Sequence, residues 1–405
     1  MKTCVRLAVL VALFLLSLGL ARAQLIIGQY EDEAPMQTWN VFGLPGAIEV
    51  GLGGTQFTLA SDTTALFANP ALMTRLPHFS ATVSGYYTST DFYRYSLVNT
   101  GVVSSDANLP LGLYALDSAA VSVRFGSWAF GVGYGLSEVY DRPPVNIDYI
   151  SYQLTFDQSG SLNVLNFSLA RAFGRHVSVG FGFNMLSGKL TRSMFEKFSA
   201  GLETITNDVT QDFKGSYFNG GLFFDVIDSF HVSLVFRAPY TKKADSRAVL
   251  SHIGLGGGTI VIEASAQDEY QEPLAAGLGM SYGLQPNWHV VCDLGYFNWS
   301  KYKVTSFDEP LARNFRDCLR ASLGMEYFAS FTFAGQEFTF PVRGGIALDQ
   351  QPMKEPRSAY FLYSLGAGLH WKHAFLDLGV LVGKETGSGR SLATQKAVLS
   401  LGVTI

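Results

Sequence analysis

The chain has few charged residues for its length. Asp, Glu, Lys and Arg make up 15% of its 405 residues, whereas about a quarter is usual in soluble proteins. Beyond residue 23 it also lacks any run of about 18 apolar residues, the length that a membrane-spanning helix needs. Low charge without such a run argues against a helical membrane bundle and favours strands that expose every second side chain to lipid.

Cysteine and histidine are scarce, which limits the chemistry that the chain can carry. Cys4 lies in the N-terminal segment, and Cys292 and Cys318 fall on opposite faces of neighbouring predicted strands, too far apart for a disulfide. The 7 histidines are scattered, so we predict no metal site. The sequence contains no G-x-S-x-G nucleophile motif, and we expect neither an enzyme nor a cofactor.

The first 23 residues predict a secretory signal peptide. Lys2 and Arg6 precede an apolar stretch over residues 7–20, and Ala21-Arg22-Ala23 matches the small-residue cleavage pattern. A membrane anchor is the alternative interpretation, which the shortness of the apolar stretch disfavours. Removal of the segment would leave 26 basic and 33 acidic residues, a balance that offers no footprint for nucleic acid.

Residues 24–77 differ from the rest of the chain because strand alternation is absent. The stretches 42–46 and 50–54 are rich in glycine and indicate irregular backbone. Asp62 can cap a short helix, which Pro70 and Pro77 would interrupt. We interpret this apolar segment as a plug that fills a barrel, and a disordered periplasmic tail is the alternative.

Residues 78–405 have the pattern of amphipathic strands. Val177, Val179 and Phe181 alternate with Ser178 and Gly180, for example. A soluble β-sandwich would alternate similarly, but with shorter strands. We predict 14 strands, an even number as in bacterial barrels, at about 78–90, 118–126, 127–140, 161–173, 175–190, 214–226, 229–241, 272–284, 287–303, 315–331, 336–349, 359–371, 373–385 and 395–405.

The connections between these strands alternate between short and long. Barrel ends with short turns face the periplasm, so the long connectors 91–117, 141–160, 191–213, 242–271 and 304–314 are expected outside the cell. Aromatic residues near strand ends predict two membrane girdles. The outer girdle would include Tyr140, Trp299 and Tyr302, and the inner one Trp128, Tyr327 and Trp371.

Three glycines occupy alternate positions on the lumen face of the third predicted strand: Gly131, Gly133 and Gly135. They leave room for the plug, or they weaken strand pairing and kink the wall. A kink would let a hydrophobic ligand leave sideways into the membrane, which is favourable because each buried CH₂ contributes about 0.8 kcal/mol.

Charged side chains also fall on the predicted lumen face. We expect them to be paired and to hold the plug by hydrogen bonds, with a ligand carboxylate bound by one arginine as the alternative. They are Arg124, Arg237, Arg320, Arg343, Asp225, Asp293, Glu326 and Asp377. Within the plug, the candidates for lining a ligand pocket are Phe57, Leu59, Leu66 and Phe67, and plain plug packing is the competing interpretation.

At Phe67-Ala68-Asn69-Pro70-Ala71, followed by Pro77 to Ser80, the chain resembles the FadL-type (OMPP1) family of outer-membrane transporters for long-chain fatty acids and hydrocarbons. That family carries an Asn-Pro-Ala motif, here Asn69, Pro70 and Ala71, at the end of an N-terminal hatch. Residues 46–62, 296–302 and 343–349 are similar to further stretches of it. The resemblance implies a 14-stranded barrel with a hatch and passive uptake of hydrophobic molecules.

The sequence therefore predicts an all-β transmembrane barrel in the bacterial outer membrane, with residues 24–77 as hatch and 78–405 as barrel. We expect it to transport long-chain fatty acids or hydrocarbons. Its other expected partners are outer-membrane lipid and, during assembly, the barrel-assembly machinery. The alternative function is a barrel that binds protein, in a secretion system or as a surface scaffold, and the plug disfavours a water-filled porin.

Overall fold

The computed structural model describes residues 42–59, 62–94, 107–149, 152–198, 203–254, 258–311 and 313–405. The predicted signal peptide and residues 24–41 of the predicted plug lie outside the described residues. Within the described part of the chain, no helix is both long enough and apolar enough to cross a membrane.

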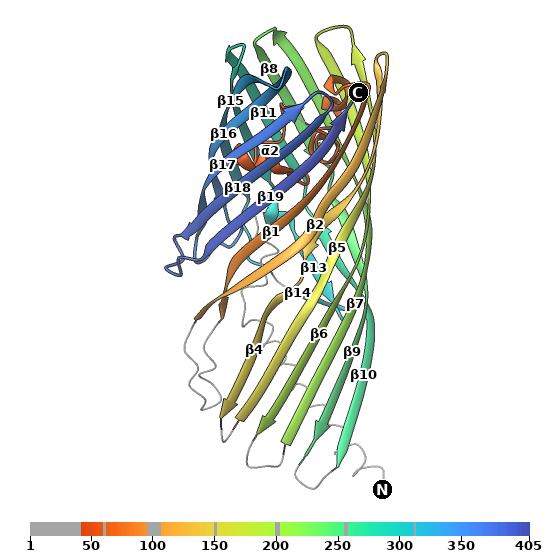
Figure 1. The fold of residues 1–405 in the computed structure, drawn as a ribbon. Coiled ribbons are helices and arrows are strands. Elements are labelled where there is room, and N and C mark those ends of the chain that lie inside the picture. Colours follow the sequence, from red (N-terminus) through yellow and green to blue (C-terminus); the bar gives the residue numbers. More distant parts are fainter. Residues whose placement is uncertain are drawn as a thin grey trace.

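Fourteen of the described strands form a closed antiparallel ring (Figure 1). Each strand pairs with the next along the chain, and the last pairs with the first through positions such as Leu399 opposite Gly85. The ring consists of β1 (Phe79–Arg94), β2 (Ala107–Phe125), β3 (Trp128–Val139), β5 (Tyr152–Phe173), β6 (Val177–Phe198), β7 (Glu203–Ile227), β8 (Phe230–Arg237), β11 (Ala275–Gln285), β12 (Trp288–Phe297), β15 (Cys318–Phe333), β16 (Gln336–Gln350), β17 (Ala359–Trp371), β18 (Ala374–Thr386) and β19 (Ala393–Thr404). The prediction of a 14-stranded barrel is confirmed.

The wall continues into an extension on one side of the barrel, opposite the short turns (Figure 1). Strands β5, β6 and β7 are 22, 22 and 25 residues long, and their outer halves form the centre of this extension. Shorter strands complete its sheet: β4 (Arg142–Tyr149), β9 (Tyr240–Ile253), β10 (Thr259–Glu272), β13 (Lys303–Ser306) and β14 (Glu309–Leu311).

The predicted connectors are wrong, because most of residues 141–160, 191–213 and 242–271 is strand rather than loop. Residues 107–117, 303–306 and 309–311 are also strand. The reason lies on the outward face. Lys189, Thr191 and Ser193 point outward on β6 beyond the lipid-facing part and are polar, because they meet water. The apolar alternation that marks the barrel strands is therefore missing there.

Two prolines mark the boundary between barrel and extension. Pro239 lies between β8 and β9, and Pro273 lies between β10 and β11. Proline has no N–H to donate to a ladder, so pairing is interrupted at both positions. On the barrel side β8 pairs with β11, and on the other side β9 pairs with β10.

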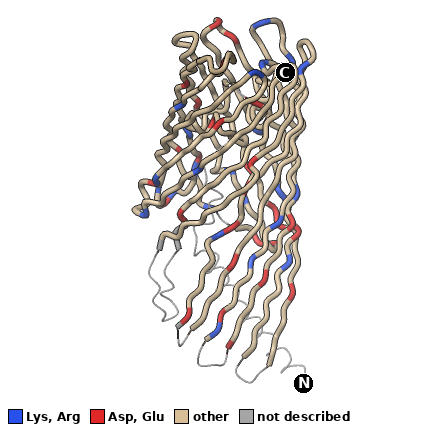
Figure 2. Tube along the Cα trace, in the orientation of Figure 1, with Lys and Arg blue, Asp and Glu red and all other residues tan. Residues whose placement is uncertain are grey.

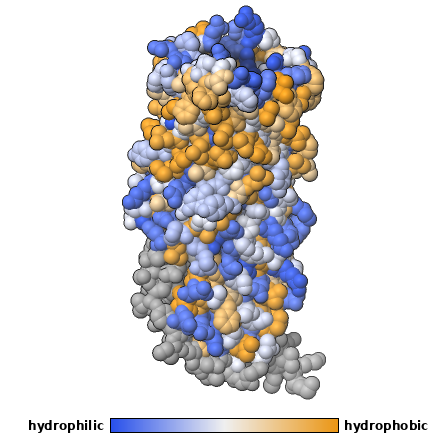
Figure 3. Space-filling view, viewed as in Figure 1, coloured by the Kyte–Doolittle hydropathy of each residue, from blue (hydrophilic) through white to orange (hydrophobic). Residues whose placement is uncertain are grey.

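The outer surface of the barrel carries an apolar band (Figure 3). Along β6 the outward side chains from Val177 to Met185 are apolar, and those from Ser187 onward are mostly polar. Charged residues gather at the short-turn end and on the extension (Figure 2). A band of this kind, between short turns and long outer strands, is typical of an outer-membrane barrel.

The predicted inner girdle of aromatic residues agrees with the structure, but the three residues of the predicted outer girdle lie elsewhere. Trp128 and Trp371 are exposed next to short turns, as expected of the inner girdle. Trp299 and Tyr302 are 6% and 9% exposed and pack inside the barrel, and Tyr140 also packs against an interior cluster. These three residues therefore do not form an outer girdle.

The hatch lies inside the ring and is almost entirely buried. It contains the short helices α2 (Ala47–Gly51) and α3 (Ala65–Ala68) and the 3₁₀ helix η1 (Pro70–Arg75). Helix α2 packs against β16 to β19, and η1 packs against β5, β6 and β7. The barrel is thus plugged, whereas the exact division at residues 77 and 78 stays a prediction.

Candidate functional site

The hatch backbone is held by charged side chains of the wall. Asp293 on β12 accepts hydrogen bonds from the backbone N–H groups of Gln56 and Phe57, at 2.5 and 3.0 Å. Arg320 on β15 donates to the carbonyl oxygen of Gly53 at 3.2 Å. Both side chains are at least nine-tenths buried, so these charge-assisted bonds form away from water, where they are strong.

Further lumen charges hold the end of the hatch near the short turns. Arg124 donates to the carbonyl oxygen of Leu76 at 2.9 Å. Arg75, in the last turn of η1, pairs with Asp225, whose other carboxylate oxygen lies 2.7 Å from Nδ1 of His231. These side chains are only partly buried, so each pair contributes less than a buried one would.

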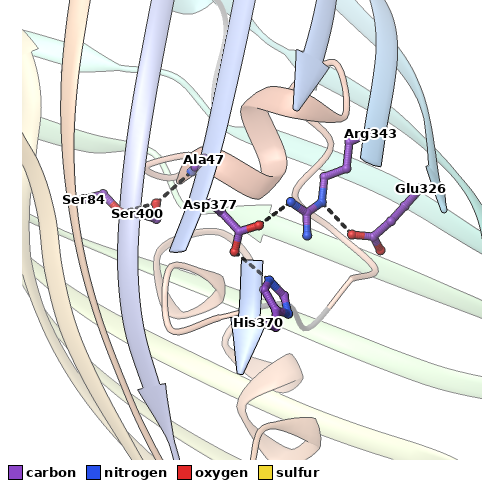
Figure 4. A network of polar contacts seen from close by, with 7 residues as sticks. All are labelled: Ala47, Ser84, Glu326, Arg343, His370, Asp377 and Ser400. Carbon is purple, nitrogen blue, oxygen red and sulfur yellow. Dashed lines mark hydrogen bonds and ion pairs between the residues drawn. The ribbon is translucent and has the colours of Figure 1, made fainter. Parts of the chain in front are cut away.

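Arg343 on β16 lies between two carboxylates of the wall (Figure 4). Its Nε and Nη1 donate to Glu326 and Asp377, each at 2.5 Å, and Asp377 also lies 3.0 Å from Nε2 of His370. Loss of one partner from such a buried group leaves an uncompensated charge and costs about 3–5 kcal/mol. A Cβ on Gly51 of α2 would lie 3.4 Å from the Cβ of Arg343, so α2 packs beside this network.

The Asn-Pro-Ala motif links the two halves of the hatch. Asn69 accepts a hydrogen bond from the N–H of Ala71 at 3.2 Å, which caps η1, and it donates to the carbonyl oxygen of Phe57 at 2.7 Å. Pro70 occupies the first turn of η1, where its missing N–H is not needed. A Cβ on Gly221 of β7 would lie 1.9 Å from the Asn69 side chain, so glycine at that position admits the motif.

A row of three buried asparagines joins the wall to the hatch, and the sequence analysis missed it. Asn166 donates to Asn184 and Asn184 donates to Asn219, each at 2.8 Å, and Asn219 donates to the carbonyl oxygen of Phe67 at 3.1 Å. The three asparagines alternate with outward apolar residues on β5, β6 and β7. That alternation was visible in the sequence, but the pairing across three strands was not.

The three glycines of β3 face the hatch. A Cβ on Gly131 would lie 2.6 Å from Met73, one on Gly133 would lie 2.6 Å from Phe67, and one on Gly135 would lie 2.2 Å from Leu44. Pairing with β2 runs through all three positions without a break, and the nearest irregularity falls between Leu136 and Glu138. The glycines therefore give the hatch room to approach the wall.

The four candidate pocket residues separate into three places. Phe57 packs with Phe42 in one interior cluster, Leu66 and Phe67 belong to a second, and Leu59 lies against a third. A small pocket is lined by Phe42, Phe57, Phe297 and the two hatch-binding side chains Asp293 and Arg320. It has room for about one water molecule, so the hatch fills the lumen at this level.

Two apolar clusters extend from the hatch toward the extension. The first runs from Leu66 and Phe67 to Phe213 and Tyr217, and the second runs from Phe57 to Trp299, Tyr302 and Phe315. Tyr270 packs against both. Sequence analysis missed this lining because Phe213 and Tyr270 lie in segments predicted as loops.

A buried cation lies where the two clusters meet. Lys242 of β9 is 3% exposed, and its Nζ lies 2.7 Å from Glu138 and 2.8 Å from Glu272. The same ammonium group is 5.9 Å from the centre of the Tyr270 ring. Arg237, the last lumen charge, ends β8 nearby and is engaged in interactions of its own.

Two hatch carboxyl groups face each other. Glu49 and Asp62 are 5% and 1% exposed. A Cβ on Gly46 would lie 3.1 Å from Oε2 of Glu49 and 3.3 Å from Oδ2 of Asp62, so the two carboxyl groups are close to each other. Burial raises the pKa of both groups, and the charge of Asp62 raises that of Glu49 further, whereas Thr64 and Arg343 lower both values.

Metal-binding and disulfide chemistry find no support in the described ranges. No three His, Cys, Asp or Glu side chains there are grouped so that they could hold a metal ion. Cys292 and Cys318 are both free thiols.

Solved structures of outer-membrane transporters share this fold. A FadL homologue from Pseudomonas aeruginosa is 15% identical, with a TM-score of 0.68 over 90% of this chain and 100% of its own. The toluene transporter TodX from Pseudomonas putida is 16% identical, with a TM-score of 0.66 over 90% of this chain and 99% of its own. The toluene transporter TbuX from Ralstonia pickettii is 18% identical, with a TM-score of 0.62 over 90% and 99%.

Among curated proteins, none matches this chain significantly. The profile of the family described as outer membrane protein transport protein (OMPP1/FadL/TodX), however, matches residues 51–390. That range covers the second half of the predicted hatch and nearly all of the barrel. The chain belongs to this family of outer-membrane transporters of hydrophobic molecules.

Proposed function

We propose that hydrophobic molecules, either hydrocarbons or long-chain fatty acids, cross the outer membrane through the interior of this barrel by passive diffusion. The ligand enters at the extension, passes the aromatic cluster around Tyr270, and reaches the pocket beside Phe57. Movement of the hatch then releases it. No chemical step is involved, so the route requires neither a cofactor nor a catalytic residue.

The observation that carries this proposal is the contact of Tyr270 with both interior clusters. Between them these clusters include Leu66, Phe67 and Phe57 of the hatch and residues at the base of the extension. An apolar lining of this extent suits a ligand without strong hydration, because apolar contact contributes about 25 cal/mol per Å² removed from water. A porin for hydrated solutes would need a polar channel instead.

The hatch is attached in a way that allows it to move. Its bonds to Asp293, Arg320 and Asn219 are hydrogen bonds rather than covalent links. Each such bond contributes only about 0.5–3 kcal/mol net. Because the pocket beside Phe57 holds about one water molecule, a ligand can occupy it only when neighbouring hatch residues shift.

Release into the membrane through the wall at β3 is the finer form of the proposal. The ladder is irregular between Leu136 and Glu138, directly after Gly135, and Leu44 of the hatch occupies the space at Gly135. Withdrawal of the hatch would uncover this part of the wall. A photoreactive apolar ligand should then label outward residues of β3, whereas labelling confined to hatch and lumen would contradict lateral release.

A protein-binding role is the second candidate, and the extension is the feature that favours it. Strand β10 pairs with β9 along residues 259–272 but with β13 only at 269–271. Ile260 and Val261 on it are 53% and 56% exposed. Recovery of one specific protein from membranes solubilised with the full chain, lost when both residues are changed to threonine, would support this role.

Native mass spectrometry of the purified protein tests the transport proposal. Protein extracted from cells grown with a hydrocarbon or a fatty acid should retain that ligand, and the variant Phe57→Ala should retain less. The matched control Phe333→Ala changes an exposed phenylalanine on β15 and should retain as much as the wild type. Absence of any apolar ligand from all three preparations would contradict the proposal.

A further inference from the structure

The lumen of the outer half of the barrel holds a buried lysine whose charge is already compensated. Lys242 Nζ lies 2.7 Å from Glu138 and 2.8 Å from Glu272, and the side chains of Lys242 and Glu272 are only 4% and 5% exposed. Glu138 is the more open partner, with 29% of its side chain exposed. Glu272 comes from β10, which pairs with β9, and Glu138 comes from β3, which does not.

This cluster lies on the proposed route. Lys242 is within cation–π distance of Tyr270, which joins the two apolar clusters. Tyr140, which packs against the first cluster, donates a hydrogen bond to Glu138 at 3.1 Å. A ligand that moves from the extension to the hatch therefore passes next to these charges.

Lys242 is already paired with two carboxylates, those of Glu138 and Glu272. Arg237 is itself engaged in interactions. The carboxylate of a fatty acid arriving here would have to displace a glutamate from Lys242 and would meet the other glutamate within a few Å. Like charges at that distance repel strongly in a buried setting.

We infer that the Lys242–Glu138–Glu272 cluster makes the route selective for uncharged hydrophobic molecules and excludes those that carry a carboxylate. This inference rests on the proposed transport function and narrows its substrate class. Lys242 has a structural role in this arrangement, because its positive charge allows two carboxylates and the ring of Tyr270 to pack closely. Both glutamates are therefore specificity-determining residues.

The arrangement is stable over the ordinary pH range. Burial by itself lowers the pKa of Lys242, but Glu138 and Glu272 more than offset this and raise it well above the usual value of a lysine. The ammonium group therefore stays charged, and discrimination should not change between about pH 6 and pH 8.

Uptake of two ligands of similar size tests this inference. Cells with an intact outer membrane and without other barrels of this family would receive labelled toluene, which is neutral, or labelled benzoate, which is an anion. The initial rate in cells without the protein is subtracted. The wild type should take up toluene at least about tenfold faster than benzoate, which corresponds to ~1.4 kcal/mol.

Removal of the two negative charges that compensate Lys242 should weaken or abolish the preference for toluene. In the double variant Glu138→Gln/Glu272→Gln, the ratio of benzoate to toluene uptake should rise at least about tenfold, because Lys242 can then pair with a carboxylate. Adding Lys242→Met to that variant should lower the ratio again. Glu263→Gln, which alters an exposed pair with Arg247 on the extension, is the matched control and should leave the ratio as in the wild type.

The other possible outcomes contradict either the inferred selectivity for uncharged ligands or the proposed transport function itself. Equal uptake of both ligands by the wild type, or an unchanged ratio in the double variant, overturns the inference while transport stands. Uptake of neither ligand by the wild type overturns the inference, and it overturns the proposed function as well if a labelled long-chain fatty acid is not taken up either. If the double variant does not assemble, Glu138→Gln alone should raise the ratio, since this partly exposed residue can be exchanged without leaving the lysine unpaired, and no rise overturns the inference.

Discussion

Among single residues, Asn69 stabilises the hatch through two hydrogen bonds of its side chain. Its side chain caps η1 and also holds the carbonyl oxygen of Phe57. Asn69→Ala removes both bonds and should lower the local stability of the hatch by about 1–2 kcal/mol. Hydrogen exchange of hatch amides should become faster in this variant, and the exposed control Asn146→Ala should exchange like the wild type. Unchanged exchange in Asn69→Ala would show that packing alone positions the motif.

The pair of Glu49 and Asp62 predicts a pH dependence of hatch seating. Because burial raises both pKa values above those of the unfolded chain, the seated hatch binds protons more tightly than the released one. Its stability is therefore fully present below about pH 4, the ordinary range of a carboxyl group, and declines as pH rises through the raised values.

Glu49→Gln should remove most of this dependence. Hatch amides of the variant should be better protected than those of the wild type at pH 7.5, and the two proteins should differ little at pH 4. The control Glu337→Gln changes an exposed carboxylate near a short turn and should follow the wild type. The same pH profile in Glu49→Gln as in the wild type would rule out a role for the pair.

At the scale of single residues, the sequence predicted which side chains face the lumen, but it did not predict which residues they pair with. Counting every second residue along a strand placed Arg124, Arg320 and Arg343 in the lumen, because the side-chain period of a strand is two. Arg343 pairs with Glu326 and Asp377, which are 17 and 34 positions away. Such pairing depends on the register between strands, which no local pattern contains.

Glycines of the strands control how closely the hatch approaches the wall. A Cβ on Gly221 would lie 1.9 Å from Asn69, whereas the nearest atom to a Cβ on Gly344 would be 3.8 Å away. Gly221→Ala should therefore displace the hatch, at a cost of about 1–3 kcal/mol, and produce open-channel events in planar bilayers. Gly344→Ala, also in a barrel strand, is the control and should remain closed. Equal conductance in the two variants would mean that the hatch does not seal the lumen through this contact.

The alternation that identifies a barrel strand depends on the lipid around it. It was clear along β6 up to Met185, but beyond that residue the outward side chains are mostly polar, although Leu190 and Met194 remain buried on the inner face. The extension was therefore predicted as loops, and with it Lys242 and Tyr270 were missed. Only pairing with β7 and β10 shows that the segment from Tyr240 to Ile253 is a strand.

At the scale of the whole molecule, the 14-stranded ring should fold without the outer part of the extension. Residues 248–253 of β9 pair with residues 259–264 of β10, and Arg247 lies opposite Ser265. Replacing residues 248–264 by Asn-Gly, which favours a two-residue hairpin, should leave the 14-stranded ring intact. The shortened protein should show the same heat-dependent shift in gel mobility as the wild type, and loss of that shift would show that the barrel needs its extension to fold.

The proposed function requires a hydrophobic molecule to pass a barrel that the hatch closes. The most direct measurement is the initial rate of toluene uptake by cells that carry the protein, compared with cells that lack it, over a range of toluene concentrations. Passage through the barrel predicts an additional uptake that saturates, because every ligand must displace the same hatch residues beside Phe57. Equal rates in the two kinds of cells at every concentration would contradict transport of hydrocarbons through this barrel.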